Sequence, residues 1–147
     1  YIQMKKAIII NEPDIIVYSS WHQIGSHKIF TADAKPVIYC VNTIPVRLFP
    51  PDFLEEVMRD PAAIEPLYTV LEQRCQQRVE YHFSKIRPAL AEHCEFYGGL
   101  PLDSGVPILV IDEVAYNAEG RPLLHTIEYS PDNQMTYELV RRRGSRS

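Results

Sequence analysis

The chain has 147 residues, a formal net charge of −4 and a hydrophobic fraction of 46%. This length fits one domain that buries about two-thirds of its unfolded surface. No apolar run approaches the ~20 residues of a membrane span, and the acidic balance argues against a nucleic-acid-binding surface in this segment. Three cysteines without a CxxC pair indicate reduced thiols in a cytoplasmic protein, and their spacing gives no support for a metal site.

The two ends of the chain carry little structural signal. The chain begins at Tyr1 with neither an initiator Met nor a signal-peptide pattern, which predicts a piece of a longer protein. The one basic cluster, Arg141–Arg143 with Arg146, lies at the C-terminus. A solvated tail is favoured over a binding site there, and residues 144–147 are expected to be disordered.

The N-terminal third reads as strands. Residues 4–18 contain two short apolar runs separated by NEPD at 11–14, which predicts two short strands with a break between them. Residues 22–30 and 36–45 predict a hairpin around 31–35. The second of these strands is apolar at most positions and is expected to be buried on both faces.

Helical signals occupy the middle of the chain. Pro50-Pro51-Asp52 predicts a helix start, with Asp52 and Glu55 as a capping box. A second helix is expected from residue 60 to Cys75, because apolar residues recur there at helical spacing. Residues 76–87 alternate as a strand, and residues 88–99 predict a short helix that ends at a Gly-Gly pair.

Residues 105–143 predict a meander of three strands joined by two turns, at Asn117–Gly120 and Ser130–Asn133. The whole order is strands, helices, then strands again. An α+β domain, with an antiparallel sheet and helices on one side, is therefore the expected fold class.

Enzyme motifs are absent: the chain has no GxSxG, HExxH or glycine-rich phosphate loop. Its five histidines are scattered, and an isolated histidine is more often structural than catalytic. Asp112 and Glu113 are adjacent on a predicted strand, so they should lie on opposite faces and cannot act as a carboxylate pair.

The predicted strand after Gly120 mixes polar and apolar residues on one face. Leu124, Thr126, Glu128 and Ser130 share that face by alternation. A pocket wall is one interpretation, because small-molecule sites place a few polar groups in an apolar lining. A plain half-exposed face is the other, and periodicity alone does not separate the two.

Four stretches together resemble a known family. They are AKP at 34–36 with the strand to 45, PLYTVLE at 66–72, LPLDSGVP at 100–107, and ILVIDEVAYNAEGRPLLHTIEY at 108–129. In this order, from about residue 15 to 143, they resemble the UTRA domain, the effector-binding module of GntR-type bacterial transcription regulators of the HutC subfamily.

The resemblance implies a chorismate-lyase-like fold over residues 1–143 that serves as a ligand sensor and not as an enzyme. It implies a small-molecule effector, no cofactor, a homodimer, and an N-terminal winged helix-turn-helix domain that is absent from this chain and through which alone operator DNA would be bound. The alternative from another class is a chorismate-lyase-like enzyme that acts on a small aromatic carboxylate, since fold does not fix function.

Site residues carried over from the family are mostly replaced. An Arg-x-Arg pair in phosphosugar-binding members aligns with Lys28 and Phe30, two family Glu residues align with Cys40 and Leu124, and of a Ser-Leu-Tyr motif only Tyr68 is kept. A family Tyr aligns near Ser130. With Thr126 from the strand alternation, the predicted ligand-binding set is Lys28, Phe30, Cys40, Tyr68, Leu124, Thr126 and Ser130; no catalytic residue and no metal ligand is predicted.

These replacements change the expected effector. Loss of the two carboxylates removes the groups that would hold sugar hydroxyls, at about 1–3 kcal/mol for each unsatisfied group. An apolar or aromatic ligand with one carboxylate on Lys28 is therefore expected in place of a phosphosugar. The competing interpretation is that Lys28 is a solvated strand residue.

Overall fold

The computed structural model describes residues 2–4, 11–19, 23–32, 35–59, 66–94, 102–131 and 137–139. Eight strands lie in these ranges: β1 Ile2–Met4, β2 Asn11–Ser19, β3 Gln23–Ala32, β4 Lys35–Pro45, β5 Tyr81–Leu90, β6 Pro107–Tyr116, β7 Pro122–Pro131 and β8 Tyr137–Leu139. Two helices lie between β4 and β5: α1 is Pro51–Arg59, and α2 is Leu67–Thr69, which continues as a π-helical segment over Val70–Arg74.

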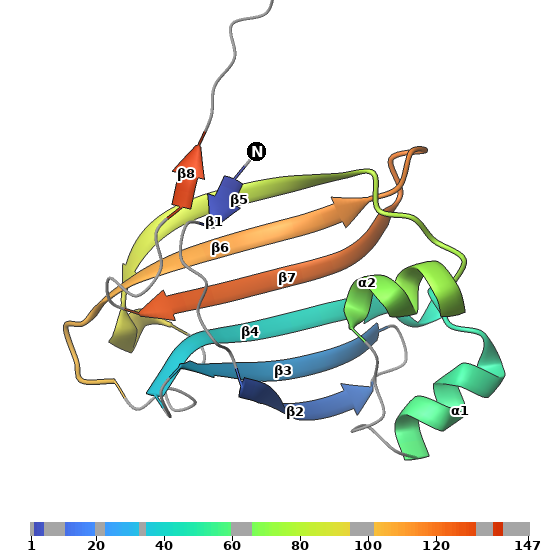
Figure 1. Ribbon diagram of the computed structural model, residues 1–147, viewed down its shortest axis with the longest axis horizontal. Helices are drawn as coiled ribbons and strands as arrows, with labels where there is room; N and C mark the ends of the chain where they lie inside the picture. The colour runs from blue at the N-terminus through green and yellow to red at the C-terminus, as the bar shows by residue number, and fades with distance from the viewer. Residues whose placement is uncertain are drawn as a thin grey trace, which may run out of the picture.

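Six strands form one antiparallel sheet in the order β2-β3-β4-β7-β6-β5, and β1 pairs with β8 in a separate two-stranded sheet. Figure 1 shows α1 and α2 together at one end of the larger sheet, beside the end of β4. The predicted fold class, an α+β domain with an antiparallel sheet flanked by helices, is confirmed. None of the described helices is both long and apolar enough to cross a membrane.

The hairpin between β6 and β7 forms at the predicted turn. Gly120 has φ +73°, a left-handed conformation that glycine adopts without steric cost, and its amide donates to the Asn117 carbonyl at 3.0 Å. The Asn117 side-chain oxygen accepts from the amides of Glu119 and Arg121 at 3.1 and 2.8 Å. This local network fixes the register of β6 against β7.

The predicted third strand of the meander was placed wrongly. β8 pairs with β1 through Gln3 opposite Glu138, and it does not pair with β7. The free edge of β7 is taken by β4, with Tyr39 opposite Tyr129 and Thr43 opposite His125. Sequence proximity favoured a meander, but the long-range β4–β7 pairing leaves β8 no place beside β7.

Two predicted breaks lie inside strands. Residues 11–14 belong to β2, where the register against β3 shifts between Asn11 and Asp14; a bulge absorbs the irregularity. Pro88 lies within β5 instead of starting a helix, and among the described residues up to Cys94 the helical ones after it form the 3-10 turn Ala91–His93. β5 is the last strand of the sheet in the described residues, where a residue without an amide donor is tolerated.

α1 begins before the residue that the predicted capping box of Asp52 and Glu55 implies. α1 begins at Pro51, so Asp52 is in its first turn and is not the residue that precedes the helix. Described structure resumes at Pro66, directly before α2, and the predicted start at residues 60–61 lies outside the described residues, as does the Gly98-Gly99 end of the other predicted helix. Leu71 and Cys75 are buried as expected, whereas Tyr68 is 49% exposed.

The sheet is buried on both faces along β4, as predicted: every residue from Val37 to Asn42 is buried. The apolar face, as we name it, carries the largest cluster, in which Tyr39, Val110 and Tyr129 pack with Ala91 of the 3-10 turn. On the opposite face, a second cluster under α2 joins Leu71 to Ala115 and Leu124. Polar side chains from β3, β4, β7 and β6 lie beside this cluster on the second face, together with apolar residues such as Ile38 and Ile111.

Candidate functional site

The polar face, as we name the side of the sheet that α2 covers, is organised by strand register. Lys28 on β3 lies opposite Cys40 on β4, and Cys40 lies opposite Glu128 on β7. In the next row, Asn42 lies opposite Thr126, and Thr126 lies opposite Glu113 on β6. Residues directly opposite one another share a face, so two adjacent rows of polar side chains cross the middle of the sheet.

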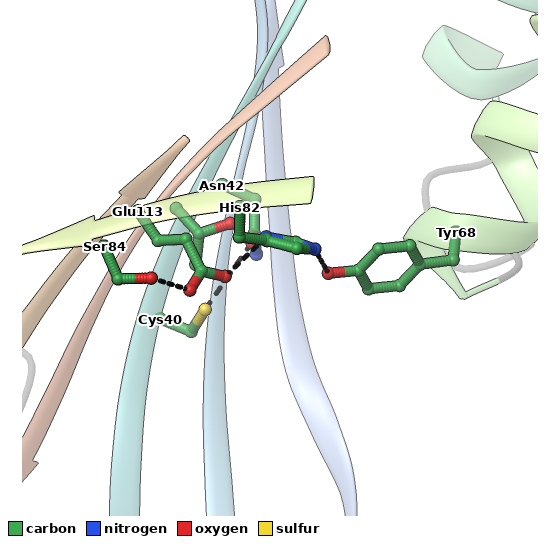
Figure 2. A network of polar contacts seen from close by, with 7 residues as sticks. Cys40, Asn42, Tyr68, His82, Ser84 and Glu113 are labelled. Atoms are coloured by element: carbon green, nitrogen blue, oxygen red, sulfur yellow. Dashed lines mark hydrogen bonds and ion pairs between the residues drawn. The ribbon is translucent and has the colours of Figure 1, made fainter. Parts of the chain in front are cut away.

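Glu113 is the centre of a hydrogen-bond network that reaches from the sheet to α2. Ser84 on β5 donates its hydroxyl to one carboxylate oxygen, and His82 Nδ1 lies 2.9 Å from the other. His82 Nε2 in turn lies 3.2 Å from the Tyr68 hydroxyl. Figure 2 shows Ser84, Glu113, His82 and Tyr68 in one continuous chain of contacts. The charged acceptor is thus well satisfied, and it connects the edge strand to the helix.

Asn42 is the acceptor at the middle of the face. Its side-chain oxygen receives hydrogen bonds from the Thr126 hydroxyl at 3.0 Å and from the Cys40 thiol at 3.5 Å. Both Asn42 and Thr126 are buried. A buried amide that is hydrogen-bonded in this way is fixed in orientation. Asn42 therefore keeps the same polar atoms in the same position on this face.

Lys28 supplies the positive charge of this face. It is half-buried, and burial lowers its pKa, because the charged form loses hydration. Within the part of the chain that the structure describes, no side chain forms an ion pair with Lys28. Burial, with a smaller contribution from Glu128, raises the pKa of the Cys40 thiol to about 12, so Cys40 is a neutral neighbour and does not neutralise the ammonium group.

Glu128 differs from Glu113 in its partners. Burial raises its pKa, and the nearby charge of Glu113 raises it further. Among the described residues, Glu128 makes no hydrogen bond or ion pair, whereas Glu113 has two donors. Counting described residues only, Glu113 is thus a satisfied carboxylate of the polar face, Glu128 an unsatisfied one and Lys28 an unpaired ammonium group.

The predicted ligand residues separate into two groups. Lys28, Cys40 and Thr126 lie in the two polar rows, and Phe30 is one row further along, opposite Ile38. Tyr68 reaches the face from α2 through His82. The other two positions are less suited to ligand contact: Leu124 is 4% exposed and packs in the cluster under α2, and Ser130 is 1% exposed with an unpartnered hydroxyl.

Sequence reasoning missed five residues of this face: Asn42, His82, Ser84, Glu113 and Glu128. Glu128 was placed on the correct face by strand alternation, but it was not assigned to the site. The rest depend on which strands are neighbours and in what register. The predicted separation of Asp112 from Glu113 holds, because Asp112 pairs with His125 at 2.8 Å on the other face.

The structure also bears on a metal site and on a separate cavity. The described residues contain no group of three His, Cys, Asp or Glu side chains that could hold a metal ion. A cavity of about 590 Å³ lies between the segment before β5 and the β6–β7 turn, lined by Gln76, Gln77, Arg78, Glu80, Asn117, Ala118, Glu119 and Arg121. Its lining side chains are almost all polar and its charges are mixed, whereas the sites of drug-sized ligands are lined mainly by apolar side chains.

A sheet face with a few fixed polar groups, bounded by apolar clusters and covered at one end by a short helix, is the arrangement of a small-molecule-binding domain. The family comparison gives this class a name. The UTRA domain model matches residues 26–136, so the chain belongs to the UTRA domain family. No curated protein matches this chain significantly.

Solved structures show the same fold. The ligand-binding domain of a protein described as a GntR-family transcriptional regulator from Bordetella bronchiseptica aligns with a TM-score of 0.69 and 15% identity, over 93% of this chain and 98% of that chain. The C-terminal domain of Yurk from Bacillus subtilis aligns at 0.65 and 18%, over 88% and 92%. PhnF from Mycobacterium smegmatis aligns with a TM-score of 0.69 and 13% identity, and the alignment covers 92% of this chain but only 62% of that chain.

The family and these neighbours support an effector-binding regulatory domain with a chorismate-lyase-like fold. The resemblance to the UTRA domain that the sequence motifs indicated is thereby confirmed. At identities below 20%, the structural likeness extends to the fold alone, and the chemistry of the site has to be argued from this chain's own residues.

Proposed function

We propose that the polar face binds a small-molecule effector with an acid group, and that the bound effector alters operator binding by a winged-helix domain of a HutC-type regulator. The observation that carries the proposal is Lys28, a half-buried ammonium group with no ion pair in the described part of the chain. A desolvated, unpaired charge lowers stability, so its presence on a polar face is better explained by a ligand than by packing.

Phe30 and Tyr68 support an effector with an apolar or aromatic body. Phe30 packs against the cluster of Val37, Ile38 and Cys40 next to Lys28, and Tyr68 lies half-exposed on α2. Ring faces of this kind cover hydrocarbon, while the ammonium group receives the acid. We further propose, from the membership of the UTRA family, that the domain works in a cytoplasmic homodimer. Effector control there requires two states with different affinities for the ligand.

A thermal-shift screen tests the anchoring role of Lys28. Small carboxylates, phosphosugars and amino-acid derivatives are each added to the wild type and to Lys28→Met. A ligand at 100 times its Kd adds about 2.7 kcal/mol, or roughly 5–10 °C in Tm for a chain of this size. We expect carboxylates to raise the Tm of the wild type and not that of Lys28→Met.

The matched control is Lys85→Met, because Lys85 is an exposed lysine on β5 opposite Asp112, away from the polar face. It should respond to carboxylates as the wild type does. Stabilisation by phosphosugars alone, or an unchanged response of Lys28→Met, contradicts the proposal.

The enzyme alternative has its own test. A chorismate lyase has to hold two carboxylates, and Lys28 is the only cation in the two polar rows traced above. We therefore expect no 4-hydroxybenzoate when the protein is incubated with chorismate and the product is followed by absorbance. Turnover would show a catalytic role and exclude a sensor-only function.

A further inference from the structure

Glu128 is a charged residue of the polar face that the resemblance to the family did not single out. It lies on the opposite side of Cys40 from Lys28, so that the three residues form one row across β3, β4 and β7. The Cα atoms of Lys28 and Glu128 are therefore about 10 Å apart, which is twice the spacing of neighbouring strands. One positive and one negative side chain therefore flank Cys40 on the polar face.

The hydrogen-bonding capacity around Glu128 is unfilled. In the described residues its carboxylate has no donor, since Ser84 and His82 both serve Glu113. Two residues along the same strand, the Ser130 hydroxyl is 1% exposed and has no hydrogen-bond partner. A buried polar group without a partner costs about 1–3 kcal/mol, and here two of them lie on one face of β7.

We propose that the effector is a zwitterion, with its acid group on Lys28 and a cationic nitrogen on Glu128. This proposal rests on the proposed function, because it adds a second anchor to the same site. An ammonium group offers three donors and a full positive charge, which is what an unpaired carboxylate lacks. The thiol of Cys40, neutral between the two anchors, keeps them apart without competing for either.

The chemical class follows from the spacing. The two anchors belong to one row with a single residue between them, so a compact ligand that carries both charges can reach both. Amino acids and their close derivatives have this form. An acid without a nitrogen leaves Glu128 unpaired and desolvated. An amine without an acid group leaves Lys28 unpaired and desolvated. Both should therefore bind more weakly than the zwitterion.

Matched ligand pairs test the proposal. The probes are the twenty standard amino acids and, for each, the acid in which hydrogen replaces the α-ammonium group, with affinities from isothermal titration calorimetry at pH 7. We expect at least one amino acid to bind the wild type about 10- to 100-fold more tightly than its des-amino partner, the effect of one charge-assisted hydrogen bond. In Glu128→Gln the two members of that pair should bind equally.

A second measurement is independent of side-chain preference. A cation that pairs with Glu128 favours its ionised form, so binding should release protons over the pH range in which the raised pKa leaves this carboxyl partly protonated. Calorimetry in two buffers of different ionisation enthalpy measures this release. We expect it in the wild type and in Glu119→Gln, an exposed glutamate in the β6–β7 turn, and not in Glu128→Gln.

The outcomes separate the two proposals. Equal affinity of amino acids and des-amino acids for the wild type, with weak binding to Lys28→Met, overturns the zwitterion and leaves the acid-binding site intact. An amino-acid preference that persists in Glu128→Gln also overturns it. Failure of every probe to bind the wild type counts against the acid-binding site itself, and the zwitterion falls with it.

Discussion

The two faces of the six-stranded sheet are made by the same strands, yet they use their polar groups in opposite ways. On the apolar face, Val110 and Tyr129 are fully or almost fully buried, and the ion pair between His125 and Asp112 keeps both side chains more than 40% exposed. On the polar face, Lys28 and Glu128 are withdrawn from water without a partner among the described residues.

This difference separates stability from recognition. Charged groups that only make a sheet soluble remain exposed to solvent, where they keep their hydration. Charged groups that are desolvated and unpaired lower stability, and proteins keep such groups mainly at functional sites. The apolar face should therefore respond to mutation through the free energy of unfolding, and the polar face through ligand affinity.

The largest expected effect lies on the apolar face. Ile108 is 3% exposed and belongs to the cluster around Val110, so Ile108→Ala should lower the free energy of unfolding by about 2–5 kcal/mol. Urea denaturation measures this loss. The control, Ile86→Ala, removes the same atoms from a side chain that is 49% exposed, and it should change stability by roughly 0.5 kcal/mol or less. Equal losses would mean that the core is not where the structure places it.

Alternation and turn chemistry predicted much of this contrast. The NAEG turn, the separation of Asp112 from Glu113 and the shared face of Thr126 and Glu128 all depend on local geometry, which a strand's period of two fixes. The structure has the turn at Gly120 and places the two acidic residues on opposite faces. The family resemblance added the overall fold, because several ordered motifs carry more information than any one of them.

What the sequence could not give is long-range register. Pairing of β7 with β4 brings Thr126 to Asn42, and pairing of β6 with β5 brings Glu113 to Ser84; neither follows from alternation, since a shift by two residues keeps every face and changes every neighbour. Another long-range pairing places β8 beside β1. The polar network was therefore outside the reach of single-strand reasoning.

Neighbouring acidic residues on β6 compare the faces directly. Glu113→Ala leaves Ser84 and His82 without their acceptor at a site where the Glu113 side chain is 29% exposed, so we expect a loss of about 1–2 kcal/mol. Asp112→Ala breaks one ion pair at 44% exposure, and it should lose less than about 1 kcal/mol. Urea denaturation of both variants measures the difference, and the reverse order would contradict the structural roles assigned here.

Glu128→Gln should raise the free energy of unfolding of the ligand-free protein, whereas the substitutions above lower it. The pKa of Glu128 is raised in the folded state, so the native protein binds this proton more tightly than the unfolded chain does. The destabilisation is absent below the unfolded value near 4.5 and grows as pH rises above it. The neutral amide should therefore raise the ligand-free stability by about 1 kcal/mol at pH 7–8 and by nothing at pH 4.

Thermal unfolding across this pH range measures the gain, with Glu119→Gln as the exposed control that should show no pH-dependent difference from the wild type. A loss of stability in Glu128→Gln at pH 7 would mean that the carboxylate has a stabilising partner in the ligand-free protein. Glu128 would then belong with Glu113 as a structural group, and the contrast between the two carboxylates would disappear.

The smallest expected effect concerns the contact between α2 and the sheet. Tyr68→Phe removes the hydroxyl that lies 3.2 Å from His82 Nε2 and keeps the ring, whose centroid is 6.0 Å from that of His82. Tyr68 is 49% exposed, so water replaces the lost partner, and we expect a loss of about 0.5 kcal/mol or less. Tyr81→Phe, at 48% exposure on the edge strand, is the matched control.

Leu71 is the reason for expecting so small an effect. It is fully buried against Leu124 and Ala115 directly after α2, so apolar packing holds the helix to the sheet and leaves the Tyr68 hydroxyl available for exchange with a ligand. A loss above about 1 kcal/mol in Tyr68→Phe would instead make the polar contact the main attachment of α2. In that case the network from Ser84 to Tyr68 would stabilise the fold, and the polar face would share the role of the apolar one.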